Sequence, residues 1–153
     1  MAGYEWWPVC RITHTDKATV TLDLREEMWF TDGPTRVQGP NYEMVMVERE
    51  DVNRVQRPRY FGFRVSFGLD FEIGDDMTDH SLLSRIVNAF NDPAATVSMS
   101  LDGGTKFADV DLTSYQGPQP FGGKTFAGAS FSLGFRCKNL IDEIPDISTG
   151  VWI

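Results

Sequence analysis

The sequence predicts a mainly β fold of the α+β type, in which antiparallel strands are accompanied by one short helix. Apolar residues recur at every second position in several segments, which is the pattern of a strand with one buried face. Helical spacing of apolar residues occurs in one stretch only, which ends near residue 90. With 153 residues and an apolar fraction of 41%, the chain can bury one core without a disulfide or a metal. We therefore expect a single domain over residues 1–153.

The N-terminal third predicts a hairpin, a loop and one further strand. Residues 18–24 (ATVTLDL) alternate apolar and polar side chains, and residues 8–15 are the expected hairpin partner. Residues 31–41 contain two Gly-Pro pairs and predict a loop. Residues 43–50 (EMVMVERE) predict the next strand, which a polar connection over residues 51–58 joins to the segment that follows.

The longest predicted strand covers residues 60–73 (YFGFRVSFGLDFEI). One face carries the apolar side chains Phe61, Phe63, Val65, Phe67, Leu69, Phe71 and Ile73. The other face carries Tyr60, Gly62, Arg64, Ser66, Gly68, Asp70 and Glu72. About fourteen residues at ~3.3 Å each reach roughly 45 Å, more than twice the usual strand length. We expect the apolar face to pack on the core and the strand to extend beyond its own sheet.

A helix and a second hairpin follow the long strand. The helix is predicted from about residue 79 or 80 to 90, because acidic residues precede it and residues 91–93 (NDP) end it. Its apolar stripe consists of Leu82, Leu83, Ile86, Val87 and Phe90. Residues 96–101 and 107–112 predict paired strands, since residues 102–104 (DGG) supply the left-handed positions of a tight turn.

The C-terminal part predicts a second long strand and an apolar tail. Residues 116–124 hold Gly and Pro and predict a loop, and residues 125–138 (TFAGASFSLGFRCK) alternate again. Both long strands carry a face of small residues, so we expect them to be neighbours in one extended sheet. The tail over residues 139–153 ends in Trp152 and Ile153, which are costly to leave in water. They are expected either to cap the core or to dock on another subunit.

The charge balance disfavours a specific reader of DNA or RNA. Twenty-two acidic and fourteen basic residues give a net charge of -8, which repels nucleic acid phosphates. An acidic surface is still suited to line a channel through which DNA slides without being retained.

The cysteines and the N-terminus indicate a reducing, non-membrane environment. Cys10 and Cys137 are neither a disulfide framework nor a metal motif, and we expect two buried, reduced thiols. No signal-like N-terminus and no apolar run of about 20 residues is present, so no membrane insertion is expected. The predicted location is the cytoplasm, or a larger assembly built there.

Candidate catalytic and metal-binding groups do not form a recognisable motif. The acidic cluster with one histidine lacks the ligand spacing of a calcium loop and fits a helix start instead; it comprises Asp75, Asp76, Asp79 and His80. His14 and His80 are not near a nucleophile motif, and His14 is expected on a strand surface. The glycines at 103–104 and 122–123 do not match a phosphate loop. The sequence predicts no enzyme, no metal and no cofactor.

Arginines are concentrated ahead of the long strand. Five of the fourteen basic residues lie within sixteen positions: Arg49, Arg54, Arg57, Arg59 and Arg64. A solvated connection and a basic patch that meets the acidic surface of a neighbour are both open interpretations.

The order of the segments resembles that of small tail proteins of long-tailed bacteriophages, of the distal tail or tail-tip hub type. The resemblance covers about residues 40 to 138 and rests on RPRYFGFRVSFGLDFEI, SLLSRIVNAF, TVSMSLDGGTKFADVDL and GKTFAGASFSLGFR. It implies the tail-tube fold, a β-sandwich or partly closed barrel with one flanking helix. It also implies a ring of six copies around a channel with an acidic wall, through which DNA passes. Long strands of neighbouring copies would join into one inner barrel, and loops would stack on adjoining rings.

The resemblance leads to a structural role in the virion, at the tail tip or baseplate, with the tail tube, hub and tape measure proteins as partners. The residues expected to face the channel or the adjoining subunit are Tyr60, Arg64, Asp70 and Glu72. Those expected to dock on an adjacent ring or subunit are Arg54, Arg57 and Arg59. Distal tail proteins often carry a further C-terminal domain that this sequence lacks, so a tail terminator or a head-tail joining protein is an alternative.

A monomeric β-barrel or sandwich that binds a small ligand or a carbohydrate is an alternative from another class. Its aromatic platform would be Trp6, Trp7, Trp29 and Tyr42, which are equally suited to a core or an interface.

Overall fold

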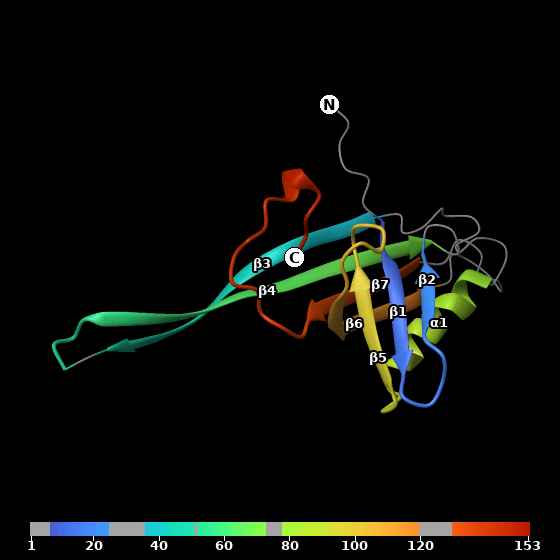
Figure 1. The fold of residues 1–153 in the computed structure, drawn as a ribbon, viewed down its shortest axis with the longest axis horizontal. Coiled ribbons are helices and arrows are strands. Elements are labelled where there is room, and N and C mark those ends of the chain that lie inside the picture. The colour runs from blue at the N-terminus through green and yellow to red at the C-terminus, as the bar shows by residue number, and fades with distance from the viewer. Residues whose placement is uncertain (1–6, 25–35, 51, 73–77, 120–129) are drawn as a thin grey trace.

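The structure is a computed structural model that describes residues 7–24, 36–50, 52–72, 78–119 and 130–153 (Figure 1). In these residues the chain forms seven strands, one α-helix and a short 3-10 helix. Their bounds are β1 Val9–His14, β2 Val20–Asp23, β3 Arg36–Glu50, β4 Gln56–Glu72, α1 Thr78–Ala89, β5 Ala95–Ser100, β6 Ala108–Gln119, β7 Ser130–Cys137 and η1 Ile147–Thr149.

The strands form one antiparallel sheet in the order β2-β1-β5-β6-β7-β4-β3. β5 and β6 are paired over a short stretch, Ser98↔Asp109 and Met99↔Ala108. The sheet turns there, so that β1, β2 and β5 run across the direction of β3, β4 and β7 (Figure 1). In the described part of the chain no pairing joins β2 to β3, so the sheet stays open. The predicted mainly β fold with one helix is confirmed, as a partly wrapped sheet.

The core lies between the two parts of the sheet. Strands β1, β2 and β5 on one side and β4 and β7 on the other contribute these buried side chains: Cys10, Ile12, Leu22, Val97, Met99, Val65, Phe67, Leu69, Phe71, Phe131, Leu133 and Phe135. The rings of Phe67 and Phe135 stack at 5.2 Å between centroids. Helix α1 packs on β1 and β5 through the buried Leu83 and Ile86. Each fully buried side chain of this kind contributes about 1.5–3 kcal/mol.

Several predicted elements are confirmed. The first hairpin pairs Cys10 with Leu22. Gly103 and Gly104 have the predicted left-handed φ, and the Asp102 carboxylate accepts from the backbone N–H of Lys106 at 3.0 Å. The connection is longer than the predicted tight hairpin, because β5 ends at Ser100 and β6 begins at Ala108. The two long strands are neighbours, with Gly68 opposite Gly134.

Three predicted loops are partly strand. β3 already begins at Arg36, β4 at Gln56, and β6 continues to Gln119. The Gly39–Pro40 pair lies at a bulge of β3 on the outer edge of the sheet, where a strand tolerates the missing proline N–H. The prediction that these Gly and Pro residues lie in loops is therefore wrong for part of each segment. Bulges and the edge strands of a sheet accommodate both residue types.

Both cysteines are free and buried, as the sequence predicts. Burial raises the pKa of Cys10 from its ordinary 9.0 to about 12, and that of Cys137 to about 11. Since the thiolate is the reactive form, both thiols should be inert in the folded protein.

We expect neither cysteine of the folded protein to react with a disulfide reagent at pH 8, and both to react once urea unfolds the chain. Burial of the two protonated thiols also contributes to the free energy of unfolding. Because their pKa values are raised in the folded state, this contribution is fully present below pH 9 and is lost as the pH rises toward 11–12. Absorbance of the released thiolate, followed with and without urea, measures the first effect. Rapid labelling of two thiols in the native protein would contradict the buried placement.

Some predicted features lie outside the described residues. The residues concerned are Trp6, Trp29, Asp75, Asp76 and the glycines at 122–123. The side chains of Glu72, Asp79 and His80 also lie outside the described part. Within the described residues, no helix is both long and apolar enough to cross a membrane.

Candidate assembly surface

The β3–β4 hairpin extends far beyond the sheet that anchors it. β3 and β4 pair from Arg36↔Asp70 to Glu50↔Gln56, whereas β7 accompanies β4 only from Ser66 to Glu72. The outer part of the hairpin is therefore a two-stranded ribbon that projects from the body (Figure 1). We call residues 44–50 and 52–62 the arm. The predicted long strand that outreaches its own sheet is confirmed.

A bulge at the base of the arm breaks the alternation seen in the sequence. Val45 pairs with Gly62 and Met46 with Tyr60, so Phe61 is an extra residue of β4. Beyond this point Tyr60 lies opposite Met46 and lines a hollow with Met44 and Phe63, whereas the sequence grouped it with Arg64 on the other face. Phe61 is 44% exposed and does not join the core, contrary to the expected apolar face.

The C-terminal tail holds the arm at this bulge. The backbone N–H groups of Phe63 and Ile141 donate to each other's carbonyl, at 2.7 and 2.9 Å. Gly62 has φ +119°, and a Cβ at that position would lie 2.6 Å from the carbonyl oxygen of Ile141. The close crossing of tail and strand therefore requires glycine at this point.

The end of the tail is fixed in the core. Trp152 is fully buried, its ring meets Phe67 edge-on at 5.7 Å, and its indole N–H donates to the Lys106 carbonyl at 3.1 Å. The Tyr42 hydroxyl of β3 donates to the Trp152 carbonyl at 2.6 Å. Of the two predicted alternatives for this residue, capping of the core is the one observed.

The arm exposes a set of large apolar side chains. They are Met44, Met46, Val47, Val52, Val55, Tyr60 and Phe61. Val52, next to the tip, is 98% exposed and Tyr60 is 61% exposed. A two-stranded ribbon has no second layer to bury these groups, so they are available to another surface.

Four of the five clustered arginines lie on the arm. Arg49 is directly opposite Arg57, and Arg54 is at the tip with φ +61°. The Arg59 guanidinium lies over the Phe61 ring at 5.2 Å. Arg64 lies at the base, opposite Glu43. The structure thus turns the predicted polar connection into the tip of a basic hairpin.

The sheet face that points away from the core carries the other predicted interface residues. The Asp70 carboxylate accepts from Gln38 Nε2 and from Ser132 Oγ, each at 2.9 Å. Arg64 and Asp70 share this half-buried, polar face of β4. Their role toward a channel or a neighbour stays a prediction.

Trp7 and Tyr42 of the predicted aromatic platform lie in the described residues, and the polar group of each side chain donates a hydrogen bond within the chain. Trp7 Nε1 donates to Asp23 Oδ2 at 3.3 Å, and its ring lies against Gly103. Tyr42 donates to Trp152, as described above.

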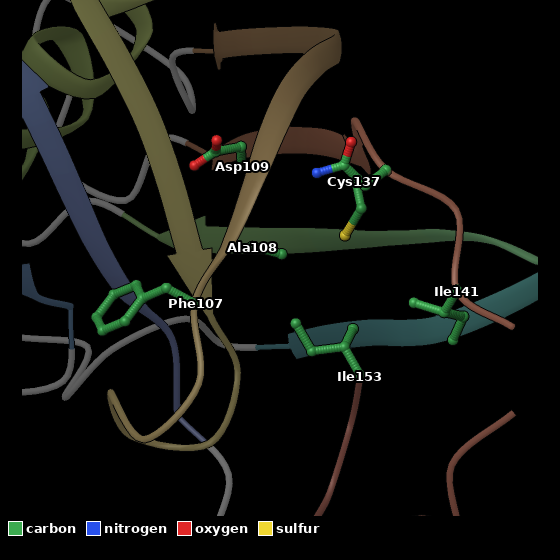
Figure 2. Close-up of a pocket in the computed structure, with 7 residues that line it drawn as sticks. Phe107, Ala108, Asp109, Cys137, Ile141 and Ile153 are labelled. Atoms are coloured by element: carbon green, nitrogen blue, oxygen red, sulfur yellow. The ribbon is translucent and has the colours of Figure 1, made fainter. Parts of the chain in front are cut away.

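The described surface has several hollows. One of about 250 Å³ is shown in Figure 2, with Cys137, Ile141 and Ile153 around it. Its carboxylate, Asp109, accepts from Ser98 Oγ at 2.6 Å. Among the described residues, no group of three or more His, Cys, Asp or Glu side chains could hold a metal ion.

Comparisons with known proteins give structural similarities only. No family model matches the chain. No curated protein matches it either. A chain of the sheath-tube complex of the PVC extracellular contractile injection system is similar, with 13% identity, 86% of each chain covered and a TM-score of 0.45. The tube-terminating cap of the anti-feeding prophage shows 12% identity, 86% and 85% coverage and a TM-score of 0.42. The PVC sheath/tube terminator shows 14% identity, 86% and 91% coverage and a TM-score of 0.44.

Proposed function

We propose that this protein is a non-enzymatic structural subunit of a phage tail, which forms a ring around the DNA channel. The observation that carries the proposal is the arm. An isolated two-stranded ribbon is marginally stable in water, and this one leaves its strand edges and seven large apolar side chains exposed. Exposed apolar side chains gathered on one projecting element are typical of an interaction site. A second copy of the chain would cover it, in keeping with the resemblance to ring-forming tail proteins.

The charge supports a channel that lets DNA pass. The net charge of -8 disfavours binding to phosphates, and the polar face of β4 with Arg64 and Asp70 is available for the channel wall or the adjoining copy. Glu72 and Tyr60 complete the proposed interface set, Tyr60 from the opposite face of the ribbon. The tips of neighbouring arms, with Arg54, Arg57 and Arg59, dock on an adjacent ring or subunit.

From the resemblance we propose that the ring lies at the tail tip or baseplate. We also propose that each ring contains six copies. Tube, hub and tape measure proteins are the proposed partners, and a terminator or head-tail joining ring is the alternative within the same class. Assembly would take place in the host cytoplasm and leave the protein in the virion.

Shortening the arm tests the proposal. We expect the wild-type chain to form a uniform oligomer, of about 100 kDa for six copies of 17.2 kDa. Replacing residues 47–59 by Asn-Gly, a two-residue turn between the paired Met46 and Tyr60, should leave a folded monomer, because the core contains no residue of this segment. Native mass spectrometry over a concentration series measures both masses.

A wild-type chain that stays monomeric at millimolar concentration would overturn the proposal. Saturable binding of a small ligand or sugar by that monomer would favour the alternative class instead. Circular dichroism of the shortened variant serves as the control for its fold.

A further inference from the structure

We propose that the arm of one copy docks on the C-terminal tail of a second copy, on a surface we call the tail segment, residues 139–151. This inference rests on the proposed function and names the acceptor surface for the arm. It follows from the positions of exposed apolar groups, from charge and from the length of the ribbon.

Exposed large apolar side chains gather in two places on the described surface. Of the twelve such residues, seven lie on the arm and four on the tail segment, and Tyr115 on β6 is the remaining one. Those of the tail segment are Leu140, Ile144, Ile147 and Val151. A surface that accepts the apolar arm should itself be apolar, and within the described residues the tail segment is the group that meets this condition.

The two surfaces carry opposite charges. From residue 44 to 62 the sequence has four arginines against three acids, whereas residues 139–151 have Asp142, Glu143 and Asp146 and no basic residue. Hydrogen bonds from the Ser148 side chain and backbone N–H hold the pKa of Asp146 below its ordinary value and favour the ionised carboxylate. Complementary charge steers such an encounter, whereas two arms, each with four arginines and three acidic residues, gain no such attraction from each other.

The base of the arm contacts the tail of its own chain, where Gly62 lies against Ile141 and one hollow is lined by Tyr60 and Asp142, but the tip of the arm lies far from the tail segment of its own chain. The tail crosses β4 at Phe63, through hydrogen bonds with Ile141, and the tip at Arg54 lies nine residues further along the ribbon. At ~3.3 Å per residue the tip is roughly 30 Å from that crossing. Figure 1 shows the ribbon leading away from the C-terminal segment. The docking must therefore join two copies.

A contact between two different surfaces is heterologous, so each copy both donates an arm and accepts one. Where the accepting copy passes its own arm to a third copy, such contacts repeat around a ring or along a filament, whereas reciprocal exchange of arms between two copies closes a dimer. The acceptor is held in place because Trp152 anchors the end of the tail in the core. In the proposed ring each copy passes its arm to the next copy, and the docking supplies this head-to-tail link.

Reciprocal charge reversal tests the docking. One variant carries Arg54→Asp and Arg59→Glu, and the other carries Asp142→Lys and Glu143→Lys; aspartate tolerates the left-handed φ of position 54. We expect each variant alone to assemble at least tenfold more weakly than wild type. An equimolar mixture should assemble again, because arms and tail segments of opposite charge then alternate. Asp16→Lys, on the β1–β2 turn, controls for net charge.

Cross-linking gives a second readout. The buried native thiols do not compete, so Val52→Cys in one variant and Ile144→Cys in another each introduce a single reactive position. Oxidation of the mixed variants should give mainly the heterodimer, in which a disulfide joins position 52 of one copy to position 144 of the other. A predominance of homodimers joined through position 52 of both copies would overturn the inference.

The outcomes separate this inference from the proposed function. If wild type assembles but the tail reversal has no effect, or if the mixture fails to recover, the tail segment is not the acceptor and the ring proposal stands. If wild type does not assemble at any concentration, the proposed function fails and the docking with it.

Discussion

Replacing Trp152 by alanine should lower the free energy of unfolding by about 3–5 kcal/mol, the range for a fully buried large aromatic. Trp152 has no exposed surface, contacts Phe67 edge-on and donates to the Lys106 carbonyl. The substitution opens a cavity and removes the donor of the hydrogen bond to the Lys106 carbonyl. Urea unfolding of the arm-shortened monomer measures the loss without interference from assembly.

A neighbouring substitution provides the control for Trp152. Val151 is exposed, so Val151→Ala should change the free energy of unfolding by less than about 0.5 kcal/mol. Equal effects at the two positions would show that Trp152 does not cap the core. The Trp152→Phe variant keeps most of the buried surface and isolates the contribution of the indole N–H.

Replacing Gly62 by alanine should lower the free energy of unfolding by about 1–3 kcal/mol through backbone strain alone. The φ of +119° is unfavourable for any side chain, and the new Cβ would meet the Ile141 carbonyl oxygen at 2.6 Å. That oxygen belongs to the pair of hydrogen bonds that fixes the tail to β4. Amide exchange at Phe63 and Ile141 should therefore accelerate in the variant, in addition to the loss of stability.

Gly68 offers a matched comparison on the same strand. A Cβ there would have ordinary contacts, the nearest at 3.5 Å, and its backbone is not in the left-handed region. Gly68→Ala should consequently have a much smaller effect than Gly62→Ala. If the two substitutions cost the same, the close crossing of tail and strand is not as described.

Much of the fold follows from the period-two pattern of the sequence. Val65, Phe67, Leu69 and Phe71 alternate in sequence and are buried in the structure, because β7 and the rest of the body cover this part of β4. The same alternation at Phe61 predicts burial that does not occur. Periodicity reports which side chains share a face, but it does not report where the covering layer ends.

The arm could be predicted only in part. The length of the strand at residues 60–73 indicates that it outreaches its sheet, and the arginines indicate a patch. The sequence does not predict the pairing of residues 36–50 with residues 56–72, because Gly39–Pro40 and the polar run up to Pro58 are typical of loops. Bulges absorb these breaks and also reverse the face of Tyr60, a shift that no local pattern in the sequence marks.

The C-terminal tail over residues 139–153 was predicted less well than the strands. Its apolar residues indicate burial or docking, and the structure separates the two outcomes: Trp152 enters the core, whereas Ile144 and Ile147 stay at the surface. This division depends on the crossing at Phe63, a long-range contact that sequence reasoning does not provide.

Electron microscopy of the wild-type protein, at a concentration where its mass is oligomeric, tests the central claim most directly. Rings with an open centre, lost when the arm is shortened to its Met46–Tyr60 base, are the predicted result. Compact particles without a central opening, or identical particles from both proteins, would contradict the account of the arm as the element that joins copies into a ring.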